Sequence, residues 1–410
     1  MKLSCEMLSE LSKAYGDAFY LLDAFKFRSN YLELLSAFQA YYPSTHIAYS
    51  YKTNYVPQLC AIVQEEGGYA EVVSEMEYAL AKRLGVEDKR IYYNGPYKKT
   101  DVLTDVLLRG THVNIDSLEE VVRVVRIAQK YADQEIKVGI RCNFDIGNGT
   151  ISRFGIDAEG DALDQAVALL KKQKNLKISG LHCHFPDRAL RSYEERIEKI
   201  LALIRRKIDW KLDYISIGGG YFGNIPKEFS TQFHTPIPLF KDYGQTVGER
   251  MWHAYKNCSE ADRPTLIIEP GSALVADAMA YVARVVSLKK IRGRDIAVLT
   301  GSLYNINPNA KGVNRPIEII RASDGHEGRQ VGSWDLTGYT CIEDDVMYHG
   351  LKEELQVGDY VVFKNIGSYS VVFKPPFILP NVPIIGLEGG SWQIVKRAET
   401  TEDIFGTFCL

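Results

Sequence analysis

Lys52 is the residue whose type and position first indicate chemistry in this chain. It follows the apolar and aromatic run Ala48-Tyr49-Ser50-Tyr51 and precedes a polar turn that leads to Pro57. A lysine at a strand end can form a Schiff base with an aldehyde when desolvation disfavours its ammonium form. Most lysines at strand ends are solvated charges instead, so this interpretation depends on what surrounds Lys52.

Two acidic residues and a pair of histidines belong to further strand-like runs. Glu71 lies within residues 70–73, and Glu269 ends the apolar run 265–269. An unpaired carboxylate in such a run would be costly, so Glu269 needs a partner, and a protonated ring nitrogen would serve. His182 and His184 should point to opposite sides of one strand. One could stack on a flat cofactor while the other packs structurally, and metal ligation by the pair is the weaker alternative because no third ligand is near.

Three consecutive glycines, Gly218-Gly219-Gly220, follow the run Ile215-Ser216-Ile217. Glycines in such a place allow backbone N–H groups to approach a phosphate closely. The simpler alternative is a flexible turn. We favour phosphate binding because the triplet directly follows a strand.

The spacing of these residues follows a repeated alternation of strand-like and helix-like segments. Residues 117–131 and 192–208 carry apolar side chains at helical spacing. The strand-like runs lie at residues 46–52, 70–73, 91–94, 112–115, 136–142, 178–184, 214–218 and 265–269. Eight such βα units predict an α/β fold, a (β/α)8 TIM barrel, with its chemistry at the C-terminal ends of the strands.

The pattern changes after residue 274. Val- and Ile-rich runs broken by Gly, Asn and Asp lie at residues 296–300, 332–339, 360–365 and 392–397. They predict a C-terminal, mostly antiparallel β domain. We expect the barrel to span residues 25–275, and residues 1–24 with 276–410 to form the β domain, since a chain of 410 residues favours two domains.

Composition limits the partners and the compartment. Apolar residues make up 46% and charged residues 25%, and the net charge is -3. This profile gives no electrostatic footprint for nucleic acid or an anionic membrane, so a small-molecule partner is favoured. No apolar run is long enough to span a membrane, and no signal-like block follows the N-terminus, so we expect a cytoplasmic protein. Seven scattered cysteines without a CxxC pair argue for reduced thiols and against a zinc site or disulfides.

Taken in order, these motifs resemble those of the fold type III pyridoxal-phosphate (PLP) decarboxylases, which include diaminopimelate, ornithine and arginine decarboxylases. Each motif alone is weak, but the ordered set is specific and covers nearly the whole chain. The barrel motifs are Tyr51-Lys52-Thr53-Asn54, Glu71-Val72-Val73-Ser74, His182-Cys183-His184, Gly218-Gly219-Gly220 and Glu269-Pro270-Gly271. The motifs of the second domain are Asn314-Arg315-Pro316, Gly338-Tyr339-Thr340-Cys341 with Asp345 beyond it, and Gly367-Ser368-Tyr369.

The resemblance implies an alanine-racemase-like barrel and a role for each matched barrel residue. Lys52 would hold PLP covalently, and Glu71 would lie beside the cofactor. His184 would stack on the ring, and Glu269 would keep the ring nitrogen protonated, which makes the ring a better electron sink. Gly218, Gly219 and Gly220 would hold the phosphate.

The resemblance also implies roles for residues of the β domain. Cys341 would donate a proton to the substrate carbon, although a buried small apolar side chain is the commoner fate of a cysteine. Arg315 and Asp345 would contact the substrate, and Tyr369 would bind the phosphate. In this family the cysteine comes from the partner subunit, so we expect a homodimer with shared active sites. We expect no metal.

Several positions depart from the family pattern. Ile342 stands where the ornithine and diaminopimelate enzymes have an acidic residue that meets the distal part of the substrate. Ser272 replaces an arginine, Pro186-Asp187 replace Gly-Ser, and Ile319 replaces a substrate-contacting tyrosine. The catalytic residues are retained while the specificity positions differ, which favours siderophore or other specialised metabolism over lysine or polyamine synthesis.

The predicted function is therefore PLP-dependent α-decarboxylation of an amino acid or of an intermediate derived from one. The alternatives are a biosynthetic decarboxylase of the diaminopimelate or ornithine type, an amino-acid racemase, and a non-catalytic regulatory protein of the same fold. Racemases of the alanine type pair the ring nitrogen with an arginine, so Glu269 argues against that alternative. Retention of Lys52, Glu269, Cys341 and Tyr369 together argues against loss of catalysis.

Overall fold

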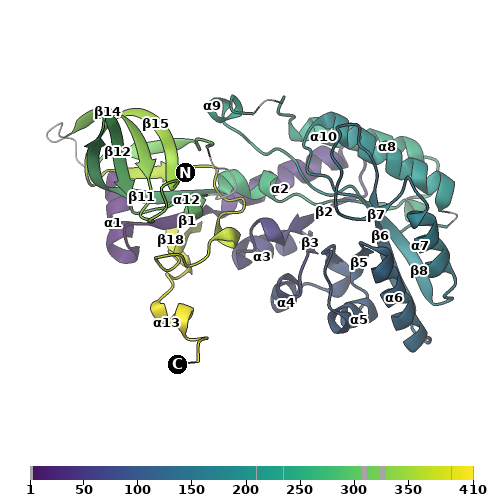
Figure 1. Ribbon diagram of the computed structural model, residues 1–410. Helices are drawn as coiled ribbons and strands as arrows, with labels where there is room; N and C mark the ends of the chain where they lie inside the picture. The colour runs from purple at the N-terminus through teal and green to yellow at the C-terminus, as the bar shows by residue number, and fades with distance from the viewer. Residues whose placement is uncertain are drawn as a thin grey trace. The chain divides into compact units, whose positions relative to one another are not determined.

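The computed structural model describes residues 3–409 except 209, 234, 307–311, 323–328 and 389. The chain divides into two compact units (Figure 1). We call the first, Arg28–Gly223 with Thr235–Ala273, the barrel unit. The second, which we call the β unit, comprises Met1–Phe27, Asn224–His234 and Leu274–Leu410.

The predicted parallel barrel is confirmed. Each of its eight strands pairs in parallel with its neighbours, β5 pairs with β6, and β10 pairs with β2 to close the ring. The strands are β2 (Thr45–Ser50), β3 (Tyr69–Val72), β4 (Ile91–Tyr93), β5 (His112–Ile115), β6 (Ile136–Asn143), β8 (Leu176–His182), β9 (Tyr214–Ser216) and β10 (Thr265–Ile268). A two-residue strand, β7 (Ile156–Asp157), pairs in parallel with the last two residues of β6.

Several barrel strands end one or two residues earlier than the sequence predicts, and two of these differences concern the places of Lys52 and His184. The strand expected at residues 46–52 ends at Ser50, because Tyr51–Thr53 forms the 3-10 turn η1. The strand expected at residues 178–184 ends at His182. Lys52 and His184 therefore lie just beyond their strands, so the alternation of side chains along a strand does not set their directions.

Helices cover the outside of the barrel (Figure 1). In α6, Ser117 caps the first turn by accepting from the backbone N–H of Glu120, and Val121 and Val124 are buried one turn apart. Val122, which lies between them in the sequence, is exposed. The helices of this unit, of which α2 begins in the β unit, are α2 (Ala24–Gln39), α3 (Pro57–Glu65), α4 (Glu75–Arg83), α5 (Thr100–Leu108), α6 (Leu118–Lys130), α7 (Ala162–Lys171), α8 (Leu190–Lys207) and α10 (Phe240–Tyr255).

Two glycines let α10 approach α2 closely. A Cβ atom at Gly244 would lie 2.1 Å from the carbonyl oxygen of Ala37, and one at Gly248 would lie 2.6 Å from Cβ of Tyr41. Helix α2 precedes the first barrel strand and α10 precedes the last barrel strand, so this contact brings these two helices side by side.

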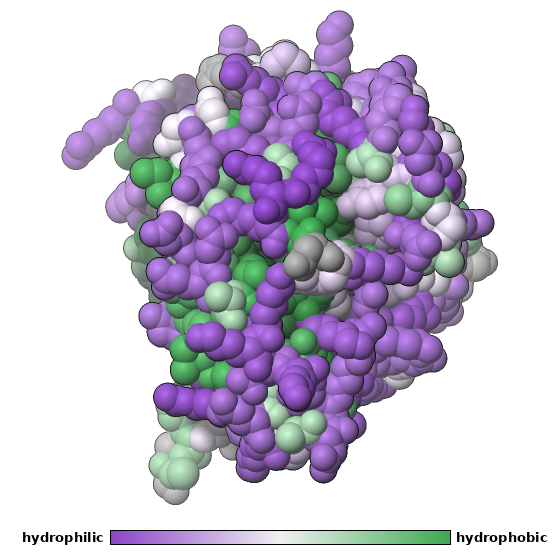
Figure 2. All heavy atoms as spheres, turned by 90° about the vertical axis from the view of Figure 1, so that its right-hand side faces the viewer, coloured by the Kyte–Doolittle hydropathy of each residue, from purple (hydrophilic) through white to green (hydrophobic). Residues whose placement is uncertain are grey.

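Figure 2 shows one face of the molecule, which hydrophilic side chains cover for the most part.

Aromatic side chains fill the barrel interior. Tyr92 and Tyr214 pack edge to face with their ring centroids 4.9 Å apart, and both are buried. Gly139 and Gly180 leave room for Tyr214, because a Cβ atom at either position would lie within 2.3 Å of its side chain. The barrel is therefore a packed core whose chemistry is confined to its ends.

The β unit contains a mostly antiparallel sheet, with the parallel pairs β1–β17 and β12–β14. Helix α1 (Cys5–Tyr15) packs Leu8 and Leu11 against this sheet in a common apolar core. The strands are β1 (Phe19–Asp23), β11 (Met279–Ile291), β12 (Arg294–Leu299), β13 (Ile317–Ile320), β14 (Gln330–Thr337), β15 (Val346–Leu355), β16 (Tyr360–Phe363), β17 (Ile384–Glu388) and β18 (Ser391–Lys396).

Short helices complete the structure. The α-helices are α1 (Cys5–Tyr15), α9 (Lys227–Ser230), α11 (Ser272–Val275), α12 (Leu303–Ile306) and α13 (Thr401–Phe405). The remaining 3-10 turns are η2 (Asp88–Arg90), η3 (Glu260–Asp262), η4 (Ala276–Ala278) and η5 (Val371–Phe373). Within the described part of the chain, no helix combines the length and the apolar character needed to cross a membrane.

Candidate active site

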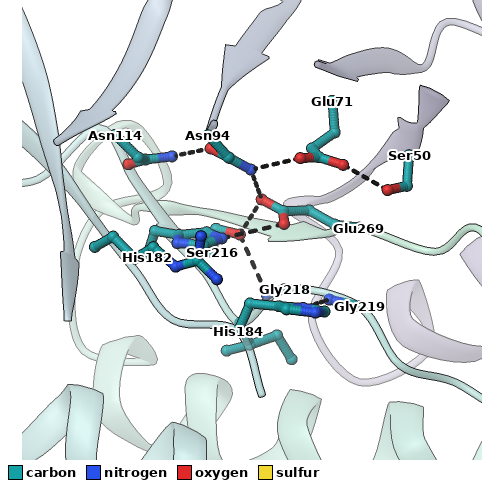
Figure 3. Close-up of polar contacts among 12 residues, drawn as sticks. Ser50, Glu71, Asn94, Asn114, His182, His184, Ser216, Gly218, Gly219 and Glu269 are labelled. Atoms are coloured by element: carbon teal, nitrogen blue, oxygen red, sulfur yellow. Dashed lines mark hydrogen bonds and ion pairs between the residues drawn. The ribbon is translucent and has the colours of Figure 1, made fainter. Parts of the chain in front are cut away.

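Polar side chains from several barrel strands meet at the C-terminal ends of those strands (Figure 3). Strand register explains the meeting, because Ser50 of β2 pairs with Glu71 of β3, and His182 of β8 pairs with Ser216 of β9. Glu269 follows β10 directly, in the place that closes the ring between these two pairs. Five separate strands thus contribute to one cluster.

Lys52 is held at this end of the barrel by a carboxylate. Its Nζ forms an ion pair with Oε2 of Glu71 and donates to Oγ of Ser50 at 2.8 Å. The Ser50 hydroxyl in turn donates to the same Glu71 oxygen at 2.5 Å. The Lys52 side chain is 34% exposed, whereas that of Glu71 is 1% exposed. The expected desolvation of the lysine is therefore not what the structure shows, because a third of its side chain is exposed and its amine pairs with a buried carboxylate.

Glu269 accepts hydrogen bonds from three sides. Asn94 Nδ2 donates to its Oε1 at 2.9 Å and Ser216 Oγ donates to the same atom at 2.7 Å, while His182 Nε2 lies 3.1 Å from Oε2. An ionised carboxylate offers about four acceptor positions. Three donors therefore leave room for one more, such as the N–H of a protonated ring.

The surroundings of Glu269 decide its charge. Burial by itself would raise its pKa, but the charge of His182, the hydrogen bond from His182, the charge of Lys52 and the Ser216 hydrogen bond together lower the pKa below its ordinary value. Glu269 is therefore a carboxylate at neutral pH. It can hold a proton on a ring nitrogen that it contacts.

The amide of Asn94 lies between Glu71 and Glu269, and a second buried asparagine, Asn114, holds it in place. Asn94 Nδ2 also donates to Oε1 of Glu71 at 3.2 Å, so one amide serves both carboxylates. Its own oxygen accepts from Asn114 Nδ2 at 2.7 Å, and the Asn114 oxygen accepts from the Tyr214 hydroxyl at 2.7 Å. This chain of donors fixes the direction of the Asn94 amide.

The glycine loop after β9 adopts a backbone that other residues rarely take. Gly218 has φ +71° and Gly220 has φ +97°, and a Cβ atom at Gly219 would lie 2.2 Å from the carbonyl oxygen of Glu269. The N–H of Gly218 donates to Ser216 Oγ at 3.3 Å. Among the described residues the N–H of Gly220 meets no acceptor, so it is available to an anion.

His184 lies against this loop as a neutral imidazole. Its Nδ1 accepts from the N–H of Gly219 at 2.9 Å, so Nδ1 carries no proton. Burial, and then the charges of Lys52, Arg196 and Arg141, lower the pKa of His184 well below its ordinary value. A neutral ring suits stacking on a flat, electron-poor partner. Its neighbour His182 faces Glu269, so the two imidazoles serve different contacts.

Cys341 lies in the β unit, on the loop between β14 and β15. The cysteine is exposed, so the alternative of a buried apolar side chain is wrong. Asp345 is 3% exposed and shapes this loop. Its Oδ1 accepts from the N–H of Leu303 at 2.7 Å and its Oδ2 from the Thr340 hydroxyl at 2.6 Å. The structure thus places Asp345 beneath the loop, and its contact with substrate stays a prediction.

Tyr369 and Arg315 also lie in the β unit. Tyr369 has φ +55°, an unusual value for a tyrosine, and its ring stacks on that of Phe373 at 5.6 Å. Arg315 donates to the carbonyl oxygen of Asn365 at 3.3 Å, and its guanidinium lies 5.2 Å from the ring centre of Phe229. Their roles with phosphate and substrate stay predictions.

Sequence reasoning missed several residues that shape the barrel site. Ser216, the last residue of β9, and Asn114, next to the last residue of β5, are polar residues beside apolar ones, a signal that could have indicated them. Arg196 lies among the apolar positions of α8 next to Ile197, so a charged residue on the buried face of a helix was the available signal. Its contacts are described below.

The fold and the site define a class of enzyme before any comparison is made. A parallel barrel presents a lysine, a buried carboxylate, a flat histidine and a glycine loop at the C-terminal ends of its strands, as in enzymes that hold a phosphorylated aromatic aldehyde. The sequence pattern of the family described as "Pyridoxal-dependent decarboxylase, pyridoxal binding domain" matches residues 29–276. The chain belongs to this family.

Individual relatives match this chain over nearly its whole length. The diaminopimelate decarboxylase of Aquifex aeolicus is 26% identical over 97% of this chain and 93% of its own length. The L-glutamyl-[BtrI acyl-carrier protein] decarboxylase of Niallia circulans is also 26% identical, over 99% of this chain and 97% of its own. The crystal structure of the diaminopimelate decarboxylase from M. jannaschii superposes with a TM-score of 0.84 at 21% identity, covering 98% and 94% of the two chains.

This chain is therefore a PLP-dependent amino-acid decarboxylase, a carboxy-lyase, and its cofactor is PLP. The residues present fit that group. The loop at Gly218, Gly219 and Gly220 has no Cβ atoms and offers a free N–H, the Glu269 carboxylate keeps one acceptor position, and the Lys52 amine lies at the same end of the barrel.

Proposed function

We propose that this enzyme removes the α-carboxylate of an amino acid whose distal part is uncharged, acylated or itself acidic. Such substrates are intermediates of siderophore or other specialised-metabolite biosynthesis. The observation that carries this proposal is Ile342, the residue after Cys341. A free distal ammonium must be paired when it is desolvated, and leaving it unpaired costs several kcal/mol. An isoleucine cannot pair with it.

A relative supports this substrate class. The Niallia circulans protein is named as a decarboxylase of an L-glutamyl group on an acyl carrier protein, and it matches this chain nearly end to end. We infer that the substrate of the present enzyme is of this general kind, an amino acid with a masked or acidic distal end. Arg315, half-buried in the β unit, is the candidate for meeting a second carboxylate.

The chain's own residues would act as follows. Glu71 Oε2 would take a proton from Lys52 Nζ, which leaves a neutral amine able to hold the cofactor. Glu269 would keep a proton on the ring nitrogen, and the neutral imidazole of His184 would lie against the ring. When bound, PLP supplies an electron sink for the pair of electrons that remains when CO2 leaves. Cys341 then delivers a proton to the α-carbon.

The exposed position of Cys341 leads us to propose a homodimer with shared sites. In a single chain the Cys341 thiol faces solvent on the β14–β15 loop, which Asp345 braces from beneath. We propose that this loop completes the active site of a second copy, with Tyr369 contributing to phosphate binding. The β unit would then provide part of each active site and of the dimer interface.

Diaminopimelate decarboxylation is the second candidate. Two observations favour it: several curated relatives are diaminopimelate decarboxylases, and the exposed carboxylates of Glu343 and Asp344 follow Ile342 on the same loop. Either carboxylate could pair with a distal ammonium if it turned toward the substrate. Side chains one or two positions along this loop need not point the same way as residue 342.

Substrate comparison separates the two candidates. We would measure kcat/KM for ornithine, lysine, arginine and meso-diaminopimelate, and for distal-N-acylated or carboxylate-bearing analogues, including a glutamyl group on a carrier protein. We expect the second group to be preferred, and an Ile342→Asp variant to gain activity on the free diamino acids. Ile291→Asp, which adds the same charge at an exposed strand end, is the control. Efficient turnover of any of the four free acids by the unmodified enzyme would overturn the proposal.

A further inference from the structure

Arg196 is a fully buried arginine whose donors are all used by the protein itself. It lies on α8 with 0% exposure, and its guanidinium has five N–H groups. Those five meet five acceptors: Ser192 Oγ at 3.1 Å and the carbonyl oxygens of Ile217 at 3.4 Å, Gly219 at 2.9 Å, Phe185 at 2.9 Å and Asp187 at 2.5 Å. The four carbonyls belong to the loops after β8 and β9.

The charge of Arg196 has no negative partner in the described part of the chain, where no carboxylate lies within ion-pair distance of it. Its guanidinium carbon lies 4.2 Å from the ring centre of Tyr193, a favourable but neutral contact. An uncompensated buried charge is strongly destabilising. Carbonyl dipoles reduce this cost, but they leave a net positive charge beneath the glycine loop.

The hydrogen bonds of Arg196 also determine which way one peptide of this loop faces. The carbonyl of Gly219 accepts from Arg196 and, at 2.8 Å, from the Tyr193 hydroxyl. In a planar trans peptide the C=O and the N–H point in opposite directions. The N–H of Gly220 therefore points away from Arg196. Of the three glycine N–H groups in the loop, it is the one that donates to no described residue.

We propose that Arg196 is a positioning residue for the phosphate of PLP. It pulls the loop carbonyls inward so that the Gly220 N–H faces the phosphate, and its buried charge is balanced by the phosphate dianion. It does not touch the phosphate, because none of its N–H groups is free. The inference rests on the proposed function and on binding of the phosphate at residues 218–220.

The test compares PLP with pyridoxal, which lacks the phosphate. Binding of each to the apoenzyme would be measured for wild type, Arg196→Met, Arg196→Lys and the control Arg205→Met, which removes an exposed arginine of the same helix. We expect Arg196→Met to weaken PLP by at least about tenfold, or about 1.4 kcal/mol, with pyridoxal little changed. Arg196→Lys should recover part of the loss, and Arg205→Met should have no effect.

Phosphorus NMR measures the protonation of the bound phosphate, which would not change if Arg196 had a structural role alone. In wild type the bound phosphate should stay dianionic as the pH falls below neutral, whereas in Arg196→Met it should take up a proton at higher pH. If Arg196→Met does not fold, Arg196→Lys and Tyr193→Phe, which removes one donor to the Gly219 carbonyl, decide the question. An unchanged ratio of PLP to pyridoxal affinity in those variants would overturn the proposal.

A loop variant separates this inference from the proposed function. Gly220→Ala strains a residue with φ +97° and should lower the affinity ratio if the phosphate binds at this loop. If Gly220→Ala lowers the ratio and Arg196→Met does not, the role of Arg196 is wrong while the phosphate site stands. If neither variant changes the ratio, the phosphate binds elsewhere and both proposals fail.

Discussion

Lys52 and Glu71 form an ion pair between the ends of two neighbouring barrel strands. The Ser50 hydroxyl joins the pair, because it accepts from Lys52 and donates to Glu71. Glu71 is almost fully buried while Lys52 reaches solvent. The carboxylate therefore both anchors the amine and is the nearest group that can take its proton.

Replacing Lys52 with alanine should remove covalent PLP and nearly all activity, because the amine positions the cofactor and prepares its exchange with the substrate. Visible absorption and the mass of the borohydride-treated protein would measure the attachment. Lys82→Ala is a matched control, since Lys82 has the same 34% exposed side chain and pairs with Asp88. Wild-type turnover by the Lys52 variant would refute the assignment.

Glu269→Gln should leave the cofactor bound but slow decarboxylation by several orders of magnitude. A neutral amide cannot hold the ring nitrogen protonated, and its NH2 group would face donors whichever way it turned: Asn94 and Ser216 on one side, or His182 on the other. Cofactor content and the thermal midpoint, measured beside kcat, separate a catalytic loss from a structural one. A rate within a factor of about ten, or roughly 1.4 kcal/mol of barrier, would contradict the role.

Mixing inactive Lys52→Ala and Cys341→Ala chains should restore part of the activity. If each site combines Lys52 of one chain with Cys341 of another, a heterodimer contains one intact site. Subunit exchange would be verified by mass, and recovered activity should be a fraction of wild type. Demonstrated exchange without recovered activity would mean that both groups act within one chain or that Cys341 is dispensable.

Glu77 should make stability depend on pH. It is 5% exposed in the first turn of α4, and burial raises its pKa from 4.5 to about 7. Because the folded pKa is the higher one, its contribution is fully present below pH 4.5 and is lost as the pH rises through 7. The free energy of unfolding should fall by on the order of 3 kcal/mol across this range.

Glu77→Gln removes this titration but keeps an oxygen that can accept from the N–H of Val73, which donates to Glu77 at 2.8 Å. Urea unfolding at about pH 5 and about pH 8 should therefore differ less for the variant than for wild type. Glu119→Gln changes an exposed acid in the first turn of α6 and serves as the control. Equal pH dependence in wild type and Glu77→Gln would show that burial does not perturb this carboxyl.

Much of the barrel could be predicted because each strand end is marked in the sequence to within two residues. An apolar run gives way to a polar or glycine residue, as at Lys52, Glu269 and Gly218, and the carboxyl ends of parallel strands gather at one end of a barrel. The eight strands therefore followed from periodicity alone. The PLP cofactor and the decarboxylase family followed from the ordered motifs that those strand ends carry.

The sequence by itself thus determined the barrel and indicated candidate residues at its strand ends, and only the tertiary structure decided what each of them contacts. Arg196 resembles any charged residue of an amphipathic helix until the fold brings its guanidinium beneath the carbonyls of the glycine loop. Lys52 was expected to be desolvated, yet it is one-third exposed and paired with Glu71. Contacts of this kind depend on which side chains of separate strands and helices face each other. A shift of one residue turns a strand side chain to the opposite face, which no local pattern records.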